Sequence, residues 1–227
     1  MRIDCHCHTI YSKHWFWGFD SLNTPLEVVK AAMKKGLNGL AITDHNKVKG
    51  SLIARKISKR FKNFIIITGS EIQTNSGDFL ALGVKEDIPK NLSIEETIEK
   101  IHDLGGIGVA PHPFGRYLLR KCVENNGRRA DAIEVFNASL TNSQNSKALQ
   151  LALKFSKPVT AGSDAHSIRE IGNAGIIFDD DPIEEILKGK TKIFGVRTPL
   201  KDIAYLTARK FIRSAEWRIS GRRDKYI

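Results

Sequence analysis

Cysteine is scarce in this chain, which contains only Cys5, Cys7 and Cys122 among its 227 residues. Three cysteines at such uneven spacing cannot build the disulfide framework of a small extracellular domain, so they favour a reducing compartment. Long apolar runs are missing too, because no stretch approaches the roughly 18 consecutive apolar residues that span a membrane. The opening segment MRIDCHCHT is too polar for a secretory signal. We therefore expect a cytoplasmic protein without a membrane span.

The composition excludes a disordered chain. Hydrophobic residues make up 41% of the sequence and charged residues 27%, which is typical of a globular domain that buries a full core. We expect a single domain over residues 1–227. A length near the upper end of the single-domain range favours a closed α/β architecture over a small binding module.

Basic residues outnumber acidic residues by 36 to 25, and the formal net charge is +11. Residues 197–227 hold nine of the basic residues and three of the acidic ones. The pattern there, with Ala204, Ala208, Phe211 and Ile212 on one stripe, predicts a basic, amphipathic C-terminal helix. Such a charge attracts phosphate-bearing ligands or nucleic acid. Two interpretations stay open: the helix docks on the body of the protein, or it binds nucleic acid.

Short β-branched runs alternate with helical patterns through most of the chain, which predicts a βα repeat with a parallel sheet. Residues 24–35 and 93–104 are expected helices, because each opens with a Ser or Thr cap followed three residues later by Glu. The expected strands cover residues 39–43, 64–69, 80–84, 106–110, 132–136 and 158–161.

Six of the seven histidines end or follow a strand-like run, and only His102 lies inside a predicted helix. In a βα barrel the carboxyl ends of the strands meet at one rim, so side chains distant in the sequence converge there. His6 and His8, two residues apart on an opening strand, point to the same face. The same alternation turns Cys5 and Cys7 away from that face, so we expect both cysteines in the core.

Each later strand also closes with a group that can bind a metal. Imidazole and carboxylate ligands together suit zinc, manganese or iron, whereas magnesium and calcium prefer oxygen alone. The segments are TDH at 43–45, GSE at 69–71, PHP at 111–113 and GSDAH at 162–166. Together with the first strand they predict a metal centre at one rim.

Taken in order, the motifs DCHCHT, TDH, GSE, PHPF and GSDAH resemble those of the polymerase-and-histidinol-phosphatase (PHP) superfamily, from Asp4 to about Arg169. The resemblance implies a distorted (β/α)7 TIM-like barrel, to which this chain adds the basic C-terminal helix. It implies two or three divalent metal ions, of zinc, manganese or iron, at the carboxyl rim. It also implies a metal-dependent phosphoric ester hydrolase whose substrate is a small phosphomonoester, a nucleotide or a nucleic-acid end.

The resemblance assigns metal ligands position by position. Those of the first ion would be His6, His8, Glu71 and Asp164. Glu71 would bridge to a second ion that His112 also holds. A third ion would be held by His45 and His166, with a further ligand at His14 or, in reserve, at Asp20. Where many members have a histidine after the bridging glutamate, this chain has Asp78, which is either an oxygen ligand or a turn residue.

The resemblance makes Glu71, Asp164 and His166 the expected catalytic residues, with a metal-activated hydroxide attacking phosphorus. Clustered divalent ions suit this chemistry, because they neutralise phosphate oxygens and lower the pKa of bound water toward about 7. Arginine forks and amide groups near the rim are candidates for binding the substrate phosphate. These residues are Arg116, Arg169 and Asn137, which alternatively are surface arginines and a cap.

The leading hypothesis is a metal-dependent phosphoesterase acting on a small phosphorylated metabolite or a nucleotide. A nuclease acting on single-stranded nucleic-acid ends is the alternative if the basic helix and the aromatic residues Trp15, Phe16 and Trp17 line one groove. A non-catalytic basic barrel bound to RNA and an amidohydrolase-like barrel are two further alternatives. The retained ligand set favours the phosphoesterase.

Overall fold

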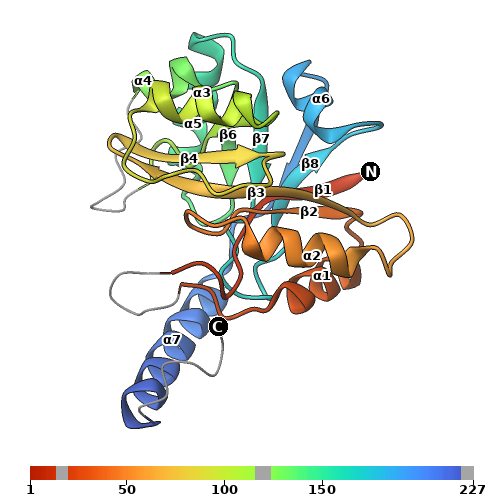
Figure 1. Ribbon diagram of the computed structural model, residues 1–227, viewed down its shortest axis with the longest axis vertical. Coiled ribbons are helices and arrows are strands. Elements are labelled where there is room, and N and C mark those ends of the chain that lie inside the picture. The colour runs from red at the N-terminus through yellow and green to blue at the C-terminus, as the bar shows by residue number, and fades with distance from the viewer. Residues whose placement is uncertain (14–19, 116–123, 221–227) are drawn as a thin grey trace.

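A computed structural model describes residues 1–13, 20–115 and 124–220 of the chain. Its strands are β1 (Arg2–Cys7), β2 (Gly39–Ile42), β3 (Ile65–Thr74), β4 (Gly77–Leu82), β5 (Ile107–Ala110), β6 (Ala132–Asn137), β7 (Val159–Gly162), β8 (Ala174–Ile177) and β9 (Lys192–Gly195). They form one sheet in the order β7-β6-β5-β4-β3-β2-β1-β8-β9 (Figure 1). The sheet curls into a nearly closed barrel, so the predicted distorted α/β barrel is confirmed, although nine strands rather than seven build it in the described residues.

The direction of β4 differs from the predicted parallel repeat. β1, β2 and β3 run parallel, and so do β5, β6 and β7, but β4 runs antiparallel to both of its neighbours. A tight turn at Asn75 and Ser76 joins β4 to β3, and such a short connection leaves no room for a crossover helix. Asp78 therefore lies on β4 opposite Gln73, and not in a loop or turn after Glu71.

The barrel closes where the end of β7 meets β1. The Asp164 N–H donates to the His6 carbonyl at 2.8 Å, and the His8 N–H donates to the Ala165 carbonyl at 2.9 Å. Gly162 permits this approach because it has no Cβ. A Cβ at that position would clash with the Cβ of His6 and lie 2.7 Å from the backbone nitrogen of His6. The same backbone contacts that close the barrel therefore bring Asp164 beside the two histidines of β1.

Most of the helices cover the outside of the barrel. The helices are α1 (Pro25–Lys34), α2 (Lys49–Ser58), α3 (Ile94–Asp103), α4 (Glu124–Arg129), α5 (Asn142–Lys154), α6 (Pro182–Leu187) and α7 (Leu200–Ser220). α1 and α3 begin at capping boxes, as predicted, because Thr24 and Ser93 exchange hydrogen bonds with Glu27 and Glu96. α1 and α2 lie on one side of the barrel, and α3, α4 and α5 lie on another (Figure 1). None of the helices in the described residues is long and apolar enough to cross a membrane.

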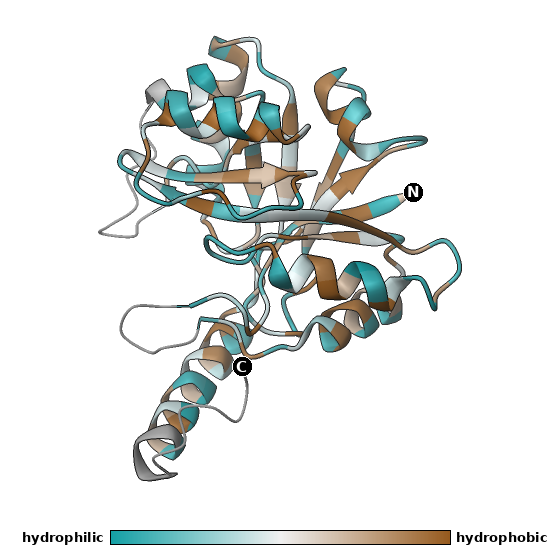
Figure 2. Ribbon diagram, viewed as in Figure 1, coloured by the Kyte–Doolittle hydropathy of each residue, from teal (hydrophilic) through white to brown (hydrophobic). Residues whose placement is uncertain are grey.

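Apolar side chains fill the core. Cys5 packs with Ile3, Ala41 and residues of neighbouring strands, whereas Cys7 packs in a second cluster that includes Val28 of α1. Both thiols are fully buried and reduced, which confirms that these cysteines belong to the core. Figure 2 shows hydrophobic residues concentrated along the strands and on parts of the covering helices.

α7 is the predicted C-terminal helix, and it extends away from the barrel (Figure 1). Hydrophilic and hydrophobic residues alternate along its length (Figure 2). In the predicted apolar stripe, Phe211 is 59% exposed and Ile212 is 49% exposed, so the body of the protein covers this stripe only in part. Ion pairs attach the helix to the body near the barrel rim.

Candidate metal centre

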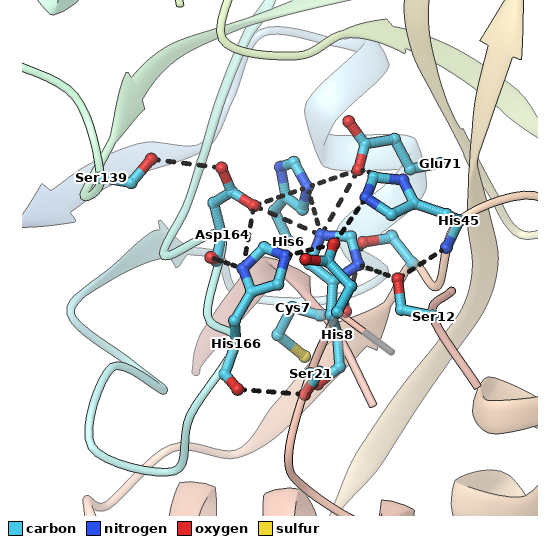
Figure 3. Close-up of polar contacts among 12 residues, drawn as sticks. His6, Cys7, His8, Ser12, Ser21, His45, Glu71, Ser139, Asp164 and His166 are labelled. Atoms are coloured by element: carbon cyan, nitrogen blue, oxygen red, sulfur yellow. Dashed lines mark hydrogen bonds and ion pairs between the residues drawn. The ribbon is translucent and has the colours of Figure 1, made fainter. Parts of the chain in front are cut away.

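Two histidines of the first strand lie at the centre of a buried cluster. His6 on β1 and His8 directly after it point to the same side, and their Nε2 atoms are 3.2 Å apart. Both residues are fully buried. Figure 3 shows Glu71, Asp164 and further histidines converging on this pair from other segments. The alternation of side chains along a strand thus places the two imidazoles together, as the sequence predicted.

Two carboxylates lie against the pair. Asp164, in the loop after β7, places Oδ1 3.3 Å from His8 Nε2 and 3.5 Å from His6 Nε2. Glu71, on β3, places Oε2 3.4 Å from His8 Nε2 and 3.5 Å from His6 Nε2. The donor atoms of His6, His8 and Asp164 all lie within 4.8 Å of one another, which is close enough to hold one ion.

Glu71 connects this group to its neighbours. Its Oε1 is 3.0 Å from Nε2 of His112, which follows β5, and its Oε2 is 3.1 Å from Nδ1 of His45, which follows β2. His6, Glu71 and His112 form a second group of donor atoms within 4.8 Å. A carboxylate whose two oxygens face different imidazoles has the arrangement of a bridging ligand.

A third group contains His8, His45 and His166, again within 4.8 Å. The buried Asp20 completes it, because its Oδ2 lies 2.8 Å from His166 Nε2 and 2.9 Å from His45 Nε2. Of the two residues considered for this position, Asp20 therefore lies at the group, while His14 lies outside the described residues.

Neighbouring side chains hold the imidazoles through their other ring nitrogen. His6 Nδ1 lies 3.0 Å from Glu134 Oε1, and His8 Nδ1 lies 3.2 Å from Ser12 Oγ. Such contacts fix the orientation of a ring, so that its Nε2 faces the cluster. The two central histidines are thus oriented as ligands by the protein itself.

Glu134 is a residue that the sequence analysis missed. It is buried on β6, where its Oε2 accepts hydrogen bonds from the His112 N–H at 2.8 Å and from Asn137 Nδ2 at 2.9 Å. The available signal was an acidic residue within the apolar run AIEVF, since a buried carboxylate needs partners. Asn137 also approaches Asp164 Oδ2 at 3.4 Å, so this predicted substrate-binding residue lies beside the cluster.

Asp4 and Asp44 are buried carboxylates that hold the segments around the cluster through hydrogen bonds. Asp44 accepts a hydrogen bond from the Thr9 hydroxyl at 2.7 Å, and Asp4 accepts one from the Ser163 N–H at 2.9 Å. Burial raises the pKa of each carboxyl to about 6, against the effect of these hydrogen bonds. The two residues connect β1 and its following loop to the segments that carry His45 and Asp164.

Burial and neighbouring charges together set the protonation of the cluster. Burial alone would raise the pKa of Asp164, but His6 and the other imidazoles hold that pKa well below its usual range, and His166 does the same for Asp20. Burial, assisted by the charge on His166, lowers the pKa of His8 to about 3. At His6 burial is outweighed by Glu134 and Asp164, which raise its pKa. Ionised carboxylates beside a neutral His8 are the forms that bind a metal.

The donor set fits divalent ions. Asp164 Oδ1 is buried and accepts no hydrogen bond of ordinary geometry from the described residues, although two imidazole nitrogens lie within 3.5 Å of it. Buried polar atoms are normally paired, so such an arrangement is costly unless a cation binds between them. The mixture of imidazole and carboxylate groups suits zinc, manganese or iron.

Two other predicted site residues lie outside these groups, and the position of a third is not described. Asp78 is buried on β4 and belongs to none of the donor groups found in the described part of the chain. Arg169 is about half exposed and stacks on Tyr205 of α7, with Cζ 3.7 Å from the ring centroid. Arg116 lies outside the described residues. A role for Asp78 or Arg169 in binding metal or substrate stays a prediction.

Two family models match the chain. One, described as PHP domain, matches residues 4–150, and the other, described as PHP-associated, matches residues 142–191. The chain belongs to the PHP domain family. The two matches together include all the histidines and carboxylates of the three donor groups. The resemblance seen in the sequence motifs is therefore confirmed.

Related sequences come from archaea and bacteria. An uncharacterized protein of Methanocaldococcus jannaschii is 44% identical over 142 residues, covering 61% of this chain and 82% of its own. A second uncharacterized protein of the same organism is 35% identical over 193 residues, covering 82% of this chain and 73% of its own. A protein of Caldicellulosiruptor saccharolyticus named "Probable phosphatase" is 27% identical over 208 residues, with 78% and 84% of the two chains covered.

Solved structures share the fold at low sequence identity. A two-domain protein of Bacteroides vulgatus that contains a predicted PHP-like metal-dependent phosphoesterase has a TM-score of 0.67 and 18% identity. The match covers 86% of this chain and 65% of that chain. An amidohydrolase of Chromobacterium violaceum has a TM-score of 0.64 and 17% identity, with 85% and 98% covered. Both carry the same distorted barrel architecture.

Proposed function

We propose that this PHP-family protein is a metal-dependent phosphoesterase that hydrolyses the phosphate ester of a small metabolite or a nucleotide. The observation that carries the proposal is the convergence of three donor groups at one rim of the barrel, with Glu71 in contact with a histidine of each. Figure 3 shows most of these side chains. The similarity to a "Probable phosphatase" supports it, as does the fold shared with a PHP-like metal-dependent phosphoesterase.

Each ion has a proposed set of ligands. The first would be held by His6, His8 and Asp164, the second by Glu71 and His112, and the third by His45, His166 and Asp20. Bound divalent ions would supply positive charge to the phosphate oxygens and would lower the pKa of a water molecule. Three carboxylates cannot cancel the charge of two or three divalent ions, so the loaded centre would attract a phosphate dianion.

The chain prepares these ligands in advance. Glu134 holds the Nδ1 side of His6, while Ser139 Oγ and Asn137 Nδ2 approach Asp164 Oδ2 at 3.2 Å and 3.4 Å. Asp164 Oδ1 is thereby left facing the imidazoles. Ligands held in their binding orientation need little rearrangement when an ion enters, and this preorganisation favours both metal affinity and catalysis.

The substrate would approach from the side of the third group. His45 and His166 have side chains that are 12% and 13% exposed, whereas those of His6 and His8 are fully buried. The partly exposed pair thus lies nearest to solvent. We assign His166, Glu71 and Asp164 to the reaction because they would contact the ions at which the phosphate binds.

The test is elemental analysis of protein purified without chelator, together with hydrolysis of an aryl phosphate with and without added manganese. We expect two or more equivalents of transition metal and metal-dependent hydrolysis. Glu71→Ala and His6→Ala should each lower both readouts strongly. His102→Gln is the matched control, since His102 on α3 is half exposed and pairs with Asp131 outside the cluster.

Two results would contradict the proposal. The first is less than one equivalent of bound metal with no hydrolysis under any metal tested. The second is hydrolysis that survives in Glu71→Ala, because the proposed bridge between the donor groups would then not be needed.

A further inference from the structure

The C-terminal helix brings a lysine to the third donor group. Lys210 Nζ on α7 lies 2.9 Å from Asp20 Oδ1, while the other oxygen of Asp20 faces His45 and His166. The two residues of this ion pair are 190 positions apart in the chain. Lys210 also lies beyond the residues that either family model matches. One carboxylate therefore connects a C-terminal cation to the candidate metal centre.

A residue of the same rim also contacts α7. Arg169, in the loop that follows His166, stacks on Tyr205 at 3.7 Å and places Nη1 3.5 Å from Asp202 Oδ1. Lys210 lies about two turns beyond Asp202 on the same helix. Arg169 thus holds the first turns of α7 at the rim, and Lys210 contacts Asp20 about two turns further along.

Lys210 has capacity for a second partner. An ammonium group carries three N–H donors, and Asp20 is the acceptor recorded for it among the described residues. Its side chain is 17% exposed, similar to the exposure of His45 and His166 on the solvent side of the cluster. The ammonium is therefore partly shielded from water, where an interaction with an anion is stronger than at a fully exposed site.

We propose that Lys210 is a substrate-binding residue that donates hydrogen bonds to the phosphate group of the ester at the candidate metal centre. The inference rests on the proposed function. The positive charge of Lys210 opposes a further cation at Asp20 Oδ1 and favours an anion next to it. A lysine acts on phosphate as a compact point charge with rotatable donors, which suits a ligand that enters beside fixed imidazoles.

The test compares Lys210→Met with Lys210→Arg and with the control Lys201→Met, which removes the same charge from an exposed position on α7. Binding of inorganic phosphate to the metal-loaded proteins is measured by titration calorimetry. Bound metal, KM and kcat for an aryl phosphate are measured on the same preparations.

We expect Lys210→Met to weaken phosphate binding about tenfold or more, because it removes a charge-assisted hydrogen bond. KM should rise by a similar factor with a smaller change in kcat, since the contact is made in both the bound substrate and the transition state. Lys210→Arg should retain most of the affinity. Bound metal should stay as in the wild type, and Lys201→Met should match the wild type in every readout.

Unchanged phosphate affinity in Lys210→Met would overturn the inference, and so would a change in bound metal that accounts for the lost affinity. The second result would mean that Lys210 only positions Asp20 and does not bind the phosphate. A wild type that hydrolyses the ester while Lys210→Met keeps its phosphate affinity refutes the role of Lys210 and leaves the proposed function standing. A metal-loaded wild type without hydrolysis refutes the proposed function, and the phosphate titrations still decide whether Lys210 binds the anion.

Discussion

Individual residues around the cluster have two different roles. Some present a donor atom to an ion, as His6 and His8 do with Nε2, and others hold those donors in place. Glu134 is the clearest of the second kind, because it contacts His6 through one oxygen and the His112 N–H and Asn137 through the other. A carboxylate there accepts from every partner, which no neutral side chain can do.

Glu134→Gln should lower the affinity for metal about 10- to 100-fold, the usual effect of losing a partner that orients a metal ligand. The amide oxygen of glutamine can accept a hydrogen bond from His6. Its NH2 group then faces the His112 N–H and Asn137 Nδ2, which are donors themselves, so those hydrogen bonds are lost. Competition with a chromogenic chelator measures the affinity. Glu95→Gln is the control, because Glu95 is more than half exposed and pairs with Arg129 on the outside. Equal affinities in the two variants would show that Glu134 does not orient His6.

At the scale of elements, the site depends on how closely β7 approaches β1. The parallel strands deliver their carboxyl ends to one rim, and the loop after β7 pairs through its backbone with His6 and His8. Gly162 is the point of closest approach, because a Cβ there would meet His6 and lie 2.9 Å from Glu134 Oε1. The absence of a side chain at Gly162 thus allows the ligands of β1 and the loop of Asp164 to lie together.

Gly162→Ala should destabilise the protein by roughly 1–3 kcal/mol, the cost of forcing an extra methyl group into a packed site. Bound metal should fall as well, since His6 and Glu134 are the groups that must move. Urea denaturation and elemental analysis provide the two readouts. Gly108→Ala on β5 is the matched control, because a Cβ there would make ordinary contacts at 3.5 Å. If both variants behave alike, the close approach of β7 to β1 is not what limits the site.

At the scale of the molecule, the donor groups connect both halves of the barrel. Their residues come from β1, β3 and the segments after β2, β5 and β7, and Lys210 adds the C-terminal helix. A metal ion that contacts all of these segments binds only the folded state, because the unfolded chain does not form the site. Metal binding and global stability should therefore be coupled.

Removing metal with a chelator should lower the melting temperature. At a free metal concentration of about 100 times Kd, binding adds about 2.7 kcal/mol, which corresponds to roughly 5–10 °C for a chain of this size. Thermal unfolding monitored by circular dichroism, with and without chelator, measures the shift. Glu71→Ala should show little or no shift, whereas His102→Gln should respond like the wild type. An identical melting temperature in both conditions would argue against a metal centre that spans the barrel.

Much of the site could be predicted from the sequence because its rules are local. Alternation along a strand placed His6 and His8 together and sent Cys5 and Cys7 to the core, and capping boxes located the starts of α1 and α3. The order of motifs at strand ends identified the family. These features depend on residues only a few positions apart, or on a pattern common to many related chains.

Other features were decided by the tertiary structure alone. The antiparallel direction of β4, the carboxylate of Glu134 beside His6 and the position of Asp20 at the third group each depend on which segments pack together. Lys210 is the extreme case, because its contact with Asp20 requires a helix 190 positions away to dock in one register. The sequence by itself determined which residue types reach the rim, since periodicity acts within each strand. Only the packed barrel decided which of them meet, because distances between segments are set by the whole fold.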